Sequence, residues 1–418
     1  MALTARMRLN SAITLTNHDN RFREVTNFMN ALHLPDGIRS RVISGVNGLD
    51  MHFLEAGFNE PSSKHTKPCV LLLHGFPELA YSWRKVMPSL AAEGYHVIAP
   101  DQRGYGETTG WDANYNTSLT PYGPLNLVTD QLALLRLLGI QKVKAVIGHD
   151  FGSRVAGWCA LTRPDVFSSV MMMSSPFTGA PDLPAGVDGS ITMHESPFEF
   201  VHKAVAQLSD LDRPRKHYQW YYSGPEANAD MQFAKQGLHN FLRAYYHSKS
   251  ADWIENKPYP LPSLSAESLA LLPTYYVMDA DQDMAQTSAH YMPDAQHIAG
   301  CKWLTEDELS VYVQSYQRTG FQGGLHWYRC GTEASCQPAL NLFSGKTIDV
   351  PSGFISGQSD WGTYQFPGAF EKMQNQTCTR MTMCELVPYA GHWVQQEQSE
   401  AVSTLLIKFI KDFSSNQP

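Results

Sequence analysis

The sequence predicts an α/β fold with a mostly parallel central sheet, helices on both faces and an inserted helical lid. Short apolar runs alternate with amphipathic runs over 42–163, an order that gives parallel sheets covered by helices. The same alternation returns after 344. Between these parts, 176–343 is rich in Tyr, His, Met and Pro, and its periodic runs look helical without interleaved strands.

The composition excludes several function classes. With 32 basic and 40 acidic side chains the formal net charge is −8, which disfavours a nucleic-acid binder because such proteins usually carry a basic face. No apolar run approaches about 18 residues, so no membrane span is expected. Seven cysteines are an odd number, and no secretory signal precedes them. Reduced thiols and a cytoplasmic location are therefore predicted.

The strands and helices of the first half follow from local patterns. Two short runs around Val42 to Glu55 flank Asn47-Gly48, a hairpin turn signal. Cys69–Leu73 is a continuous apolar run, which is typical of a strand buried on both faces. The same reasoning predicts strands at 97–99 and 143–147, and helices at 126–138 and 153–163.

The second half gives the remaining elements and the domain boundaries. Helix 304–317 is predicted inside the lid, with Thr305 as its N-cap. Short strands follow at 353–355 and 385–387, and the i, i+3, i+4 rule predicts a final helix over Val402, Leu405, Leu406, Phe409, Ile410 and Phe413. We expect an N-terminal extension (1–40), a core (41–175 and 344–418) and a helical lid, or cap (176–343).

The strongest chemical signal is residues 148–152, Gly-His-Asp-Phe-Gly, which follow a predicted strand and open a predicted helix. A nucleophile elbow needs this context, because two glycines allow a tight turn that exposes the central side chain. An ordinary strand-to-helix turn is the alternative. We predict that Asp150, which stands where many hydrolases have serine, is the nucleophile.

Two further residues complete a triad in the chain order nucleophile, acid, histidine. Asp360 follows the strand at 353–355, and His392 follows the strand at 385–387. All three residues are thus expected at the C-terminal edge of the sheet, where open α/β sheets place their sites. Asp349 is the competing acid, but it precedes its strand and would lie on the opposite edge.

An oxyanion hole is predicted beside the nucleophile. Residues 74–77, His-Gly-Phe-Pro, follow directly after the strand Cys69–Leu73, and a turn there can direct the backbone N–H of Phe76 at the pocket. The N–H of Phe151, at the start of the next helix, is the second expected donor.

The carboxylate nucleophile decides the chemistry. Asp150 can displace a leaving group at saturated carbon and form an alkyl ester. Water can then hydrolyse that ester, with His392 as general base and Asp360 orienting it. A serine attacking the same carbon would form an ether, which is a dead end. The sequence therefore favours substrates that react at an alkyl carbon.

These motifs resemble those of the soluble epoxide hydrolases of the α/β-hydrolase superfamily. The matching stretches are 74–77, 101–106 (Asp-Gln-Arg-Gly-Tyr-Gly), the elbow at Asp150, the loop with Asp360, and 391–393 (Gly-His-Trp). The similarity runs from about Val42 to the end of the chain. It implies an α/β-hydrolase fold with a cap, and hydrolysis of a lipophilic epoxide to a vicinal diol.

The resemblance also implies two cap tyrosines that donate hydrogen bonds to the epoxide oxygen. Residues 320–329 indicate Tyr328 for one of them. Residues 218–221 indicate Tyr218 for the other, with Tyr221 and Tyr222 as close rivals. A phenol suits this role because it is protonated near pH 7 and can donate a hydrogen bond.

The expected ligands are a small lipophilic epoxide and water, because an aromatic-rich lid favours an apolar pocket. We expect no metal, no organic cofactor and a monomer or homodimer. The substrate pocket is predicted to be lined by Phe76, Pro77, Phe151, Gln219, Trp327, Trp361 and Trp393.

Two other functions stay open. Haloalkane and haloacid dehalogenases use the same aspartate, but many haloalkane enzymes place a halide-binding Trp directly after it, where this chain has Phe151. Fluoroacetate dehalogenases typically place Arg there to bind a carboxylate. Phe151 counts against both readings, although Arg154 lies close by. A non-catalytic ligand receptor is the third reading, because a fold does not fix a function.

Overall fold

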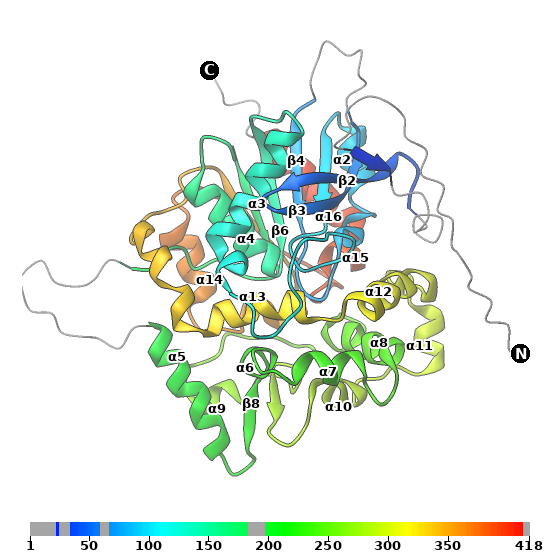
Figure 1. Ribbon diagram of the computed structural model, residues 1–418. Coiled ribbons are helices and arrows are strands. Elements are labelled where there is room, and N and C mark those ends of the chain that lie inside the picture. The colour runs from blue at the N-terminus through cyan, green and yellow to red at the C-terminus, as the bar shows by residue number, and fades with distance from the viewer. Residues whose placement is uncertain (1–21, 25–33, 59–66, 183–196, 413–418) are drawn as a thin grey trace, which may run out of the picture.

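A nine-stranded sheet forms the centre of the described part of the chain (Figure 1). The computed structural model describes residues 22–24, 34–58, 67–182 and 197–412. The strands are β1 (Phe22–Glu24), β2 (Ile38–Val46), β3 (Leu49–Ala56), β4 (Cys69–Leu73), β5 (His96–Pro100), β6 (Val143–His149), β7 (Val170–Met173), β10 (Ser352–Gly357) and β11 (Met381–Val387). They lie in the order β1-β2-β3-β5-β4-β6-β7-β10-β11. The pairings from β1 to β5 are antiparallel, and those from β5 to β11 are parallel.

Helices cover both faces of this sheet, as predicted. Along β4, Leu71 and Leu73 pack into one apolar cluster, while Val70 and Leu72 pack into the other. Side chains alternate across a strand, so a continuous apolar run places a core on each face. The first cluster includes residues of α3 (Pro124–Leu137) and α4 (Phe151–Thr162). The second includes residues of α2 (Met87–Ala92) and α16 (Ser399–Asp412).

Most of the predicted helices and strands begin and end within about three residues of their predicted positions. The exception is the C-terminal strand. The hairpin turns at Asn47, which has a φ of 49°, and Gly48. Helix α4 begins at Phe151, two residues before the predicted start, and β11 begins four residues before the predicted 385. Strand β7 was not predicted from the sequence, because its four residues (Val-Met-Met-Met) are too few for a periodic pattern.

The segment between β7 and β10 is mainly helical. Its longer helices are α5 (Pro197–Ala206), α8 (Leu238–Lys249), α12 (Glu306–Thr319) and α13 (Gln322–Thr332), and its shorter ones are α6 (Tyr218–Tyr222), α7 (Ala227–Gln232), α9 (Ala266–Leu269), α10 (Met284–Ala289) and α11 (Ala295–Gly300). Together they lie along one side of the sheet and its helices (Figure 1). The Thr305 N-cap is confirmed: its hydroxyl accepts from the Glu308 N–H, and the Glu308 carboxylate accepts from the Thr305 N–H.

The expectation that this segment contains no strands is wrong. Strands β8 (Arg215–His217) and β9 (Val277–Asp279) form a two-stranded antiparallel sheet. Each strand has three residues, and β8 is made of polar side chains, so neither shows the alternation by which strands are recognised.

The structure describes part of the predicted N-terminal extension and most of the predicted last helix. Strand β1 falls within the predicted extension 1–40 and pairs with β2. Residues 1–21 and 25–33 of that extension lie outside the described residues, as does Phe413 of the predicted last helix. Two short helices, α14 (Ala369–Lys372) and α15 (Val394–Glu397), complete the core. No helix among the described residues is long and apolar enough to cross a membrane.

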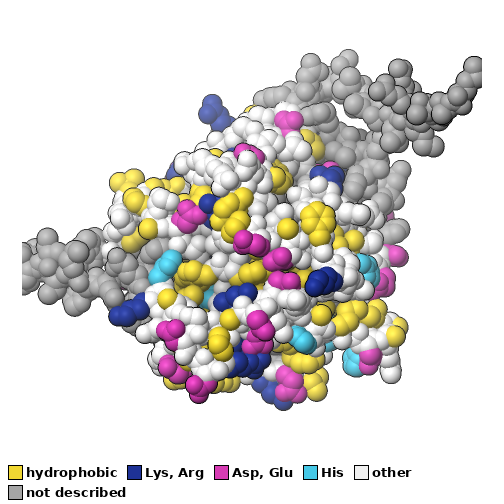
Figure 2. Space-filling model, turned by 60° about the horizontal axis from the view of Figure 1, so that its bottom comes forward, with side chains coloured by type: hydrophobic (Ala, Val, Ile, Leu, Met, Phe, Trp, Pro, Cys, Tyr) yellow, Lys and Arg dark blue, Asp and Glu magenta, His cyan; other side chains and the backbone are white. Residues whose placement is uncertain are grey.

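Surface charges are mixed in sign. On the face shown in Figure 2, acidic, basic and hydrophobic side chains are interspersed without a single large basic field. This pattern agrees with the negative net charge of −8. A nucleic-acid-binding face would instead gather basic side chains.

Candidate active site

Asp150 stands at the turn between β6 and α4, in a strained conformation. Its φ is 54° and its ψ is −118°. Residues other than glycine rarely adopt this backbone conformation, and those that do are often found at functional sites. A Cβ on Gly148 would lie 1.9 Å from the carbonyl oxygen of Gly152, and one on Gly152 would lie 2.1 Å from that of Leu73. Both glycines are therefore required for the turn that presents Asp150.

Asp150, His392 and Asp360 come together beyond the C-terminal ends of three strands. Asp360 follows β10, and His392 follows β11. The Nδ1 atom of His392 lies 3.2 Å from both carboxylate oxygens of Asp360. On the other side of the ring, Nε2 lies 3.4 Å from Oδ2 of Asp150. The spatial order is that of a nucleophile, a base and an orienting acid.

Backbone and hydroxyl donors hold Asp360 in place. Its Oδ1 accepts from the Gly362 N–H at 2.7 Å, and its Oδ2 accepts from the Ser356 hydroxyl at 3.1 Å. Burial raises the pKa of Asp360, but His392 and the Gly362 N–H outweigh burial, so the pKa lies below its usual value. Asp360 is thus held as a carboxylate, which fixes the proton of His392 on Nδ1.

The charges of the site favour a protonated histidine in the free protein. Burial lowers the pKa of His392, but Asp360 and Asp150 raise it to about 9. Burial raises the pKa of Asp150, but His392 and the Phe76 N–H hold it below its usual value. Loss of the Asp150 charge would therefore lower the pKa of His392 and convert it into a base.

One predicted oxyanion donor already contacts the nucleophile. The Phe76 N–H donates to Oδ1 of Asp150 at 3.0 Å. Phe151 is the first residue of α4, and the first N–H groups of a helix have no partner within the helix. Phe151 follows Asp150 in the chain, and the Phe76 N–H contacts its carboxylate in space. Both N–H groups can therefore face an oxyanion that forms on the Asp150 carboxyl carbon.

Tyr218 and Tyr328 reach the site from the helical segment. Their ring centroids are 5.8 Å apart, and the Tyr328 ring lies 4.5 Å from that of Phe151 and 5.3 Å from that of Phe76. The Tyr218 hydroxyl accepts from Nε2 of Gln219 at 3.1 Å, whereas the Tyr328 hydroxyl has no hydrogen-bond partner among the described residues. Burial and Asp150 raise the pKa of both phenols, so both remain donors.

The two rival tyrosines are engaged elsewhere. The Tyr221 hydroxyl donates to Asp230 at 2.7 Å. The Tyr222 hydroxyl lies 3.3 Å from that of Tyr245, within hydrogen-bond distance. The Tyr218 hydroxyl also has a side-chain acceptor, Oε1 of Gln365 at 3.5 Å. The Tyr222 ring lies 4.9 Å from that of Tyr328, closer than the 5.8 Å of Tyr218. The assignment of Tyr218 therefore stays a prediction from the sequence.

The other predicted pocket residues fall into two groups. The Trp327 ring lies 5.8 Å from that of Phe151, although its indole N–H donates to the Arg103 carbonyl oxygen. Three others have contacts of their own: the Pro77 carbonyl oxygen accepts from the Tyr246 hydroxyl, the Trp393 ring lies 4.7 Å from that of His392, and the Trp361 ring lies 5.0 Å from that of Tyr259.

A buried pair behind the triad was missed by the sequence analysis. Nδ1 of His149 lies 2.5 Å from a Glu78 carboxylate oxygen, and Nε2 donates to the backbone carbonyl of His392 at 2.7 Å. The other Glu78 oxygen accepts from Gln395 and Gln396, each at 2.9 Å. His149 belongs to the elbow motif itself, but its partner is 71 residues away, and no local pattern joins them.

Glu78→Gln is expected to lower the free energy of unfolding by about 3 kcal/mol at pH 7, because it leaves His149 without its charged partner in the interior. Burial raises the pKa of Glu78, but His149 outweighs burial, so the pKa lies below its usual value. Such a carboxylate stabilises the fold above its unfolded pKa and loses that contribution as the pH falls. Chemical denaturation should therefore show a difference at pH 7 that shrinks below roughly pH 4. Equal stability at pH 7 would contradict the pairing.

Lys249 is a second feature that the sequence did not reveal. Its ammonium group lies 4.6 to 5.9 Å from the ring centroids of Tyr218, Tyr245, Tyr275 and Tyr276. Burial lowers its pKa to about 8, against the opposing effects of Asp150 and Asp360. Its backbone carbonyl accepts the His392 N–H at 2.8 Å. Lys249 therefore joins α8 to the loop that carries His392.

Comparisons with known proteins identify relatives of this chain. Residues 68–398 match the family model described as alpha/beta hydrolase fold. An epoxide hydrolase of Caballeronia sordidicola is 29% identical over 368 residues, which cover 87% of this chain and 92% of that protein. Epoxide hydrolase A of Mycobacterium tuberculosis is 28% identical over 373 residues, covering 87% of this chain and 95% of that protein.

Solved structures give the same result. An epoxide hydrolase from an endophytic Streptomyces matches with a TM-score of 0.70 at 26% identity, covering 91% of this chain and 97% of that one. Potato (Solanum tuberosum) epoxide hydrolase I matches with a TM-score of 0.64 at 28% identity, covering 90% and 99%. The chain therefore belongs to the epoxide hydrolases, hydrolases of the α/β-hydrolase fold that act on ether bonds.

Proposed function

We propose that the protein hydrolyses a lipophilic epoxide to a vicinal diol through a covalent ester on Asp150. An oxygen of Asp150 attacks one ring carbon, and the bond from that carbon to the epoxide oxygen breaks. Tyr218 and Tyr328 donate hydrogen bonds to the oxygen as its negative charge develops, and it takes up a proton. The product of this step is a hydroxyalkyl ester of Asp150.

In the second step water hydrolyses the ester at the Asp150 carboxyl carbon. Esterification removes the charge of Asp150, so the pKa of His392 falls and its Nε2 releases the proton that it carries in the free protein. This release balances the proton that the epoxide oxygen takes up in the first step, and Nε2 can then take a proton from water. Asp360 stabilises the resulting imidazolium. The N–H groups of Phe76 and Phe151 stabilise the oxyanion, which then collapses to release the diol and restore the carboxylate.

One observation carries this proposal: a carboxylate at the elbow faces a histidine on one oxygen and a backbone N–H on the other. His392 Nε2 lies 3.4 Å from Oδ2 of Asp150, and the Phe76 N–H lies 3.0 Å from Oδ1. The first contact suits a base for water, and the second suits an oxyanion hole. A dehalogenase would share both groups, but the Phe151 side chain has no N–H donor for a halide.

Product analysis distinguishes the candidate reactions. The purified protein is incubated with a panel of lipophilic epoxides and, separately, with haloalkanes and haloacids. Diols formed from epoxides, without halide release, are the expected result. Halide release without diols would instead establish the dehalogenase reading, and tight ligand binding without either product would establish a receptor.

Removing one phenol hydroxyl is expected to slow the opening of the epoxide. Tyr328→Phe should lower kcat by roughly 10-fold to 100-fold, because a hydrogen bond to a charged group contributes about 1.5–3 kcal/mol. Tyr218→Phe should have a similar effect, and Tyr221→Phe, whose hydroxyl contacts Asp230, serves as the matched control. Rapid-mixing kinetics of ester formation measures the effect. A Tyr221→Phe defect as large as that of Tyr218→Phe would overturn the assignment.

We also propose a domain arrangement and a cellular location for the protein. We assign residues 41–175 and 344–418 to the catalytic core and 176–343 to the cap that contributes Tyr218 and Tyr328. All seven cysteines are free thiols, which supports the cytoplasmic location predicted from the sequence.

A further inference from the structure

Lys249 is a buried cation without an ionic partner in contact with it. The residue is 4% exposed, and within the described part of the chain its ammonium group forms no hydrogen bond or ion pair. The group lies over aromatic rings instead, with the centroid of Tyr276 at 4.6 Å and that of Tyr218 at 5.2 Å. Aromatic faces attract a cation, but a charge in the interior stays costly unless an opposite charge offsets it. That opposite charge must come from farther away.

The opposite charges that act on Lys249 belong to the candidate active site. Asp150 and Asp360 both favour its protonated form. The same two carboxylates approach the ring of His392, Asp150 at Nε2 and Asp360 at Nδ1. The His392 backbone N–H also donates to the Lys249 carbonyl oxygen at 2.8 Å. Lys249 and His392 therefore share one pair of carboxylates.

The other titratable groups around these two cations keep their charge in the proposed reaction. On the side of His392, the His149 ring centroid lies 5.0 Å away, and His149 is paired with Glu78. Glu397 accepts from the backbone N–H groups on either side of His392, at 2.9 Å each. On the side of the lysine, burial raises the pKa of the four surrounding tyrosines, which stay neutral. The charge balance of the site therefore depends on the two carboxylates and the two cations.

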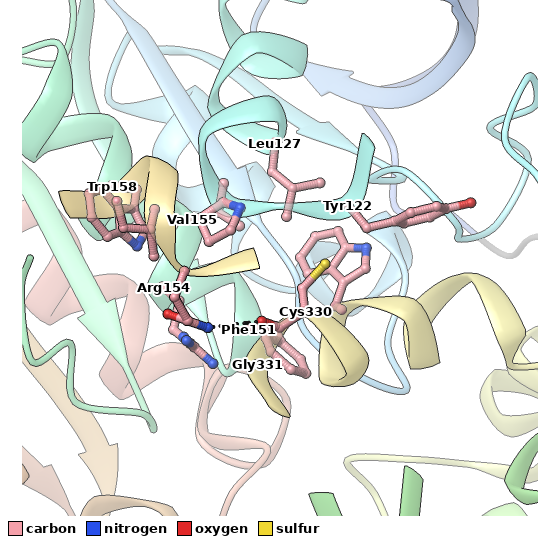
Figure 3. A pocket seen from close by; sticks show the side chains of 12 residues that line it. Tyr122, Leu127, Phe151, Arg154, Val155, Trp158, Cys330 and Gly331 are labelled. Atoms are coloured by element: carbon pink, nitrogen blue, oxygen red, sulfur yellow. Dashed lines mark hydrogen bonds between the residues drawn. The ribbon is translucent and has the colours of Figure 1, made fainter. Parts of the chain in front are cut away.

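Arg154 is another cation near the nucleophile, but it is exposed. It interacts with Asp150 from the first turn of α4. Its side chain lies beside Phe151 at the apolar pocket shown in Figure 3 and is open to solvent. Water and salt screen an exposed charge far more than a buried one. The buried charge of Lys249 is therefore expected to have the larger effect on the site.

Esterification of Asp150 leaves two cations facing one carboxylate. His392 loses a carboxylate that lies 3.4 Å from its Nε2, whereas Lys249 loses one that acts on it from beyond ion-pair distance. A histidine also has the lower ordinary pKa, about 6.5 against about 10.4 for a lysine. The proton is therefore expected to leave His392, while Lys249 remains as the cation that balances Asp360. Without Lys249, the imidazolium itself would balance Asp360 and would keep its proton.

We propose that Lys249 is a positioning residue for the hydrolysis of the ester: its positive charge balances Asp360 once Asp150 is esterified, and so frees His392 to act as a base. This inference rests on the proposed function and adds to it a residue outside the triad. A cation close to a histidine disfavours the imidazolium, and the interaction between two charges is stronger in the interior than in water.

Single-turnover kinetics over a range of pH tests the proposal. Lys249→Met removes the charge and keeps an unbranched side chain. Its ester hydrolysis is expected to reach half of the maximal rate about one pH unit higher than in wild type, and to be roughly 10-fold slower below that point. At high pH the two rates should converge. Lys249→Arg, which keeps the charge, should retain the midpoint of wild type. A loss of the same size at every pH would indicate a structural role and would overturn the proposal.

A titration without turnover separates this inference from the proposed function. Asp150→Asn replaces the nucleophile with a neutral group of the same shape, and so mimics the charge of the ester. The pKa of His392 is measured by NMR in Asp150→Asn and in the double variant with Lys249→Met, and its signal is identified by its absence from His392→Gln. The midpoint should lie about one pH unit higher in the double variant, whether or not epoxides are hydrolysed. Equal midpoints would contradict the inference even if epoxides are hydrolysed.

The matched control is Lys144→Met. Lys144 is a half-buried lysine near the start of β6, whereas the triad lies beyond the ends of the strands. The variant removes the same charge and should leave the midpoint of ester hydrolysis and the pKa of His392 unchanged. An effect as large as that of Lys249→Met would mean that the net charge of the protein, rather than the place of Lys249, controls His392, and would overturn the proposal.

Discussion

Replacing Asp150 with Ala is expected to abolish diol formation, with a fall in kcat of roughly 10⁴-fold or more. No other described carboxylate combines a contact with His392 Nε2 and a backbone donor on its second oxygen. Without Asp150 the ester cannot form, and the remaining donors can only bind the epoxide. Diol quantification by mass spectrometry measures the loss.

The matched control for this variant is Asp349→Ala. Asp349 is the acid that competed with Asp360 in the sequence, and the structure places it at the surface, where its carboxylate accepts from Thr347 and Thr379. The Asp349→Ala variant should keep its activity within about twofold, as is usual for a surface substitution. Residual diol formation by Asp150→Ala above a few per cent of wild type would contradict the nucleophile assignment.

The second large effect is expected from His392→Asn. This variant should still open the epoxide but should hydrolyse the ester at least roughly 10³-fold more slowly, because its general base is gone. The covalent adduct should then accumulate. Intact-protein mass spectrometry is expected to show a mass increase equal to that of the epoxide, on a peptide that contains Asp150.

A histidine outside the site is the control for this experiment. His290→Asn changes an exposed residue of the helical segment and should turn over normally without accumulating adduct. If His392→Asn formed neither adduct nor diol, His392 would be needed for the first step, and the two-step account would be wrong.

Much of the fold was predictable because each core strand is marked in the sequence by its own short run of apolar residues. Cys69–Leu73 was predicted with its observed bounds, since a strand buried on both faces needs no alternation. The strands of the helical segment were not predictable. Arg215–His217 pairs with Val277–Asp279 across about 60 residues, and neither strand has a pattern of its own.

The proximity of the three predicted triad residues was predictable for a related reason. Asp150, Asp360 and His392 each follow a strand, and parallel strands bring their C-terminal ends to one edge. Glu78 and Lys249 carry no such signal, because their roles depend on contacts with His149 and with four tyrosine rings that only the folded chain assembles. A single sequence carries no local signal for contacts between residues that lie this far apart in the chain.

The central claim, an ester on Asp150 hydrolysed at its carboxyl carbon, is tested most directly by a single turnover in ¹⁸O-labelled water with enzyme in excess. The first diol should then carry unlabelled oxygen from Asp150, and the peptide containing Asp150 should gain ¹⁸O. Label in the first diol, with none in the peptide, would mean that water attacks the epoxide directly, and would contradict the account.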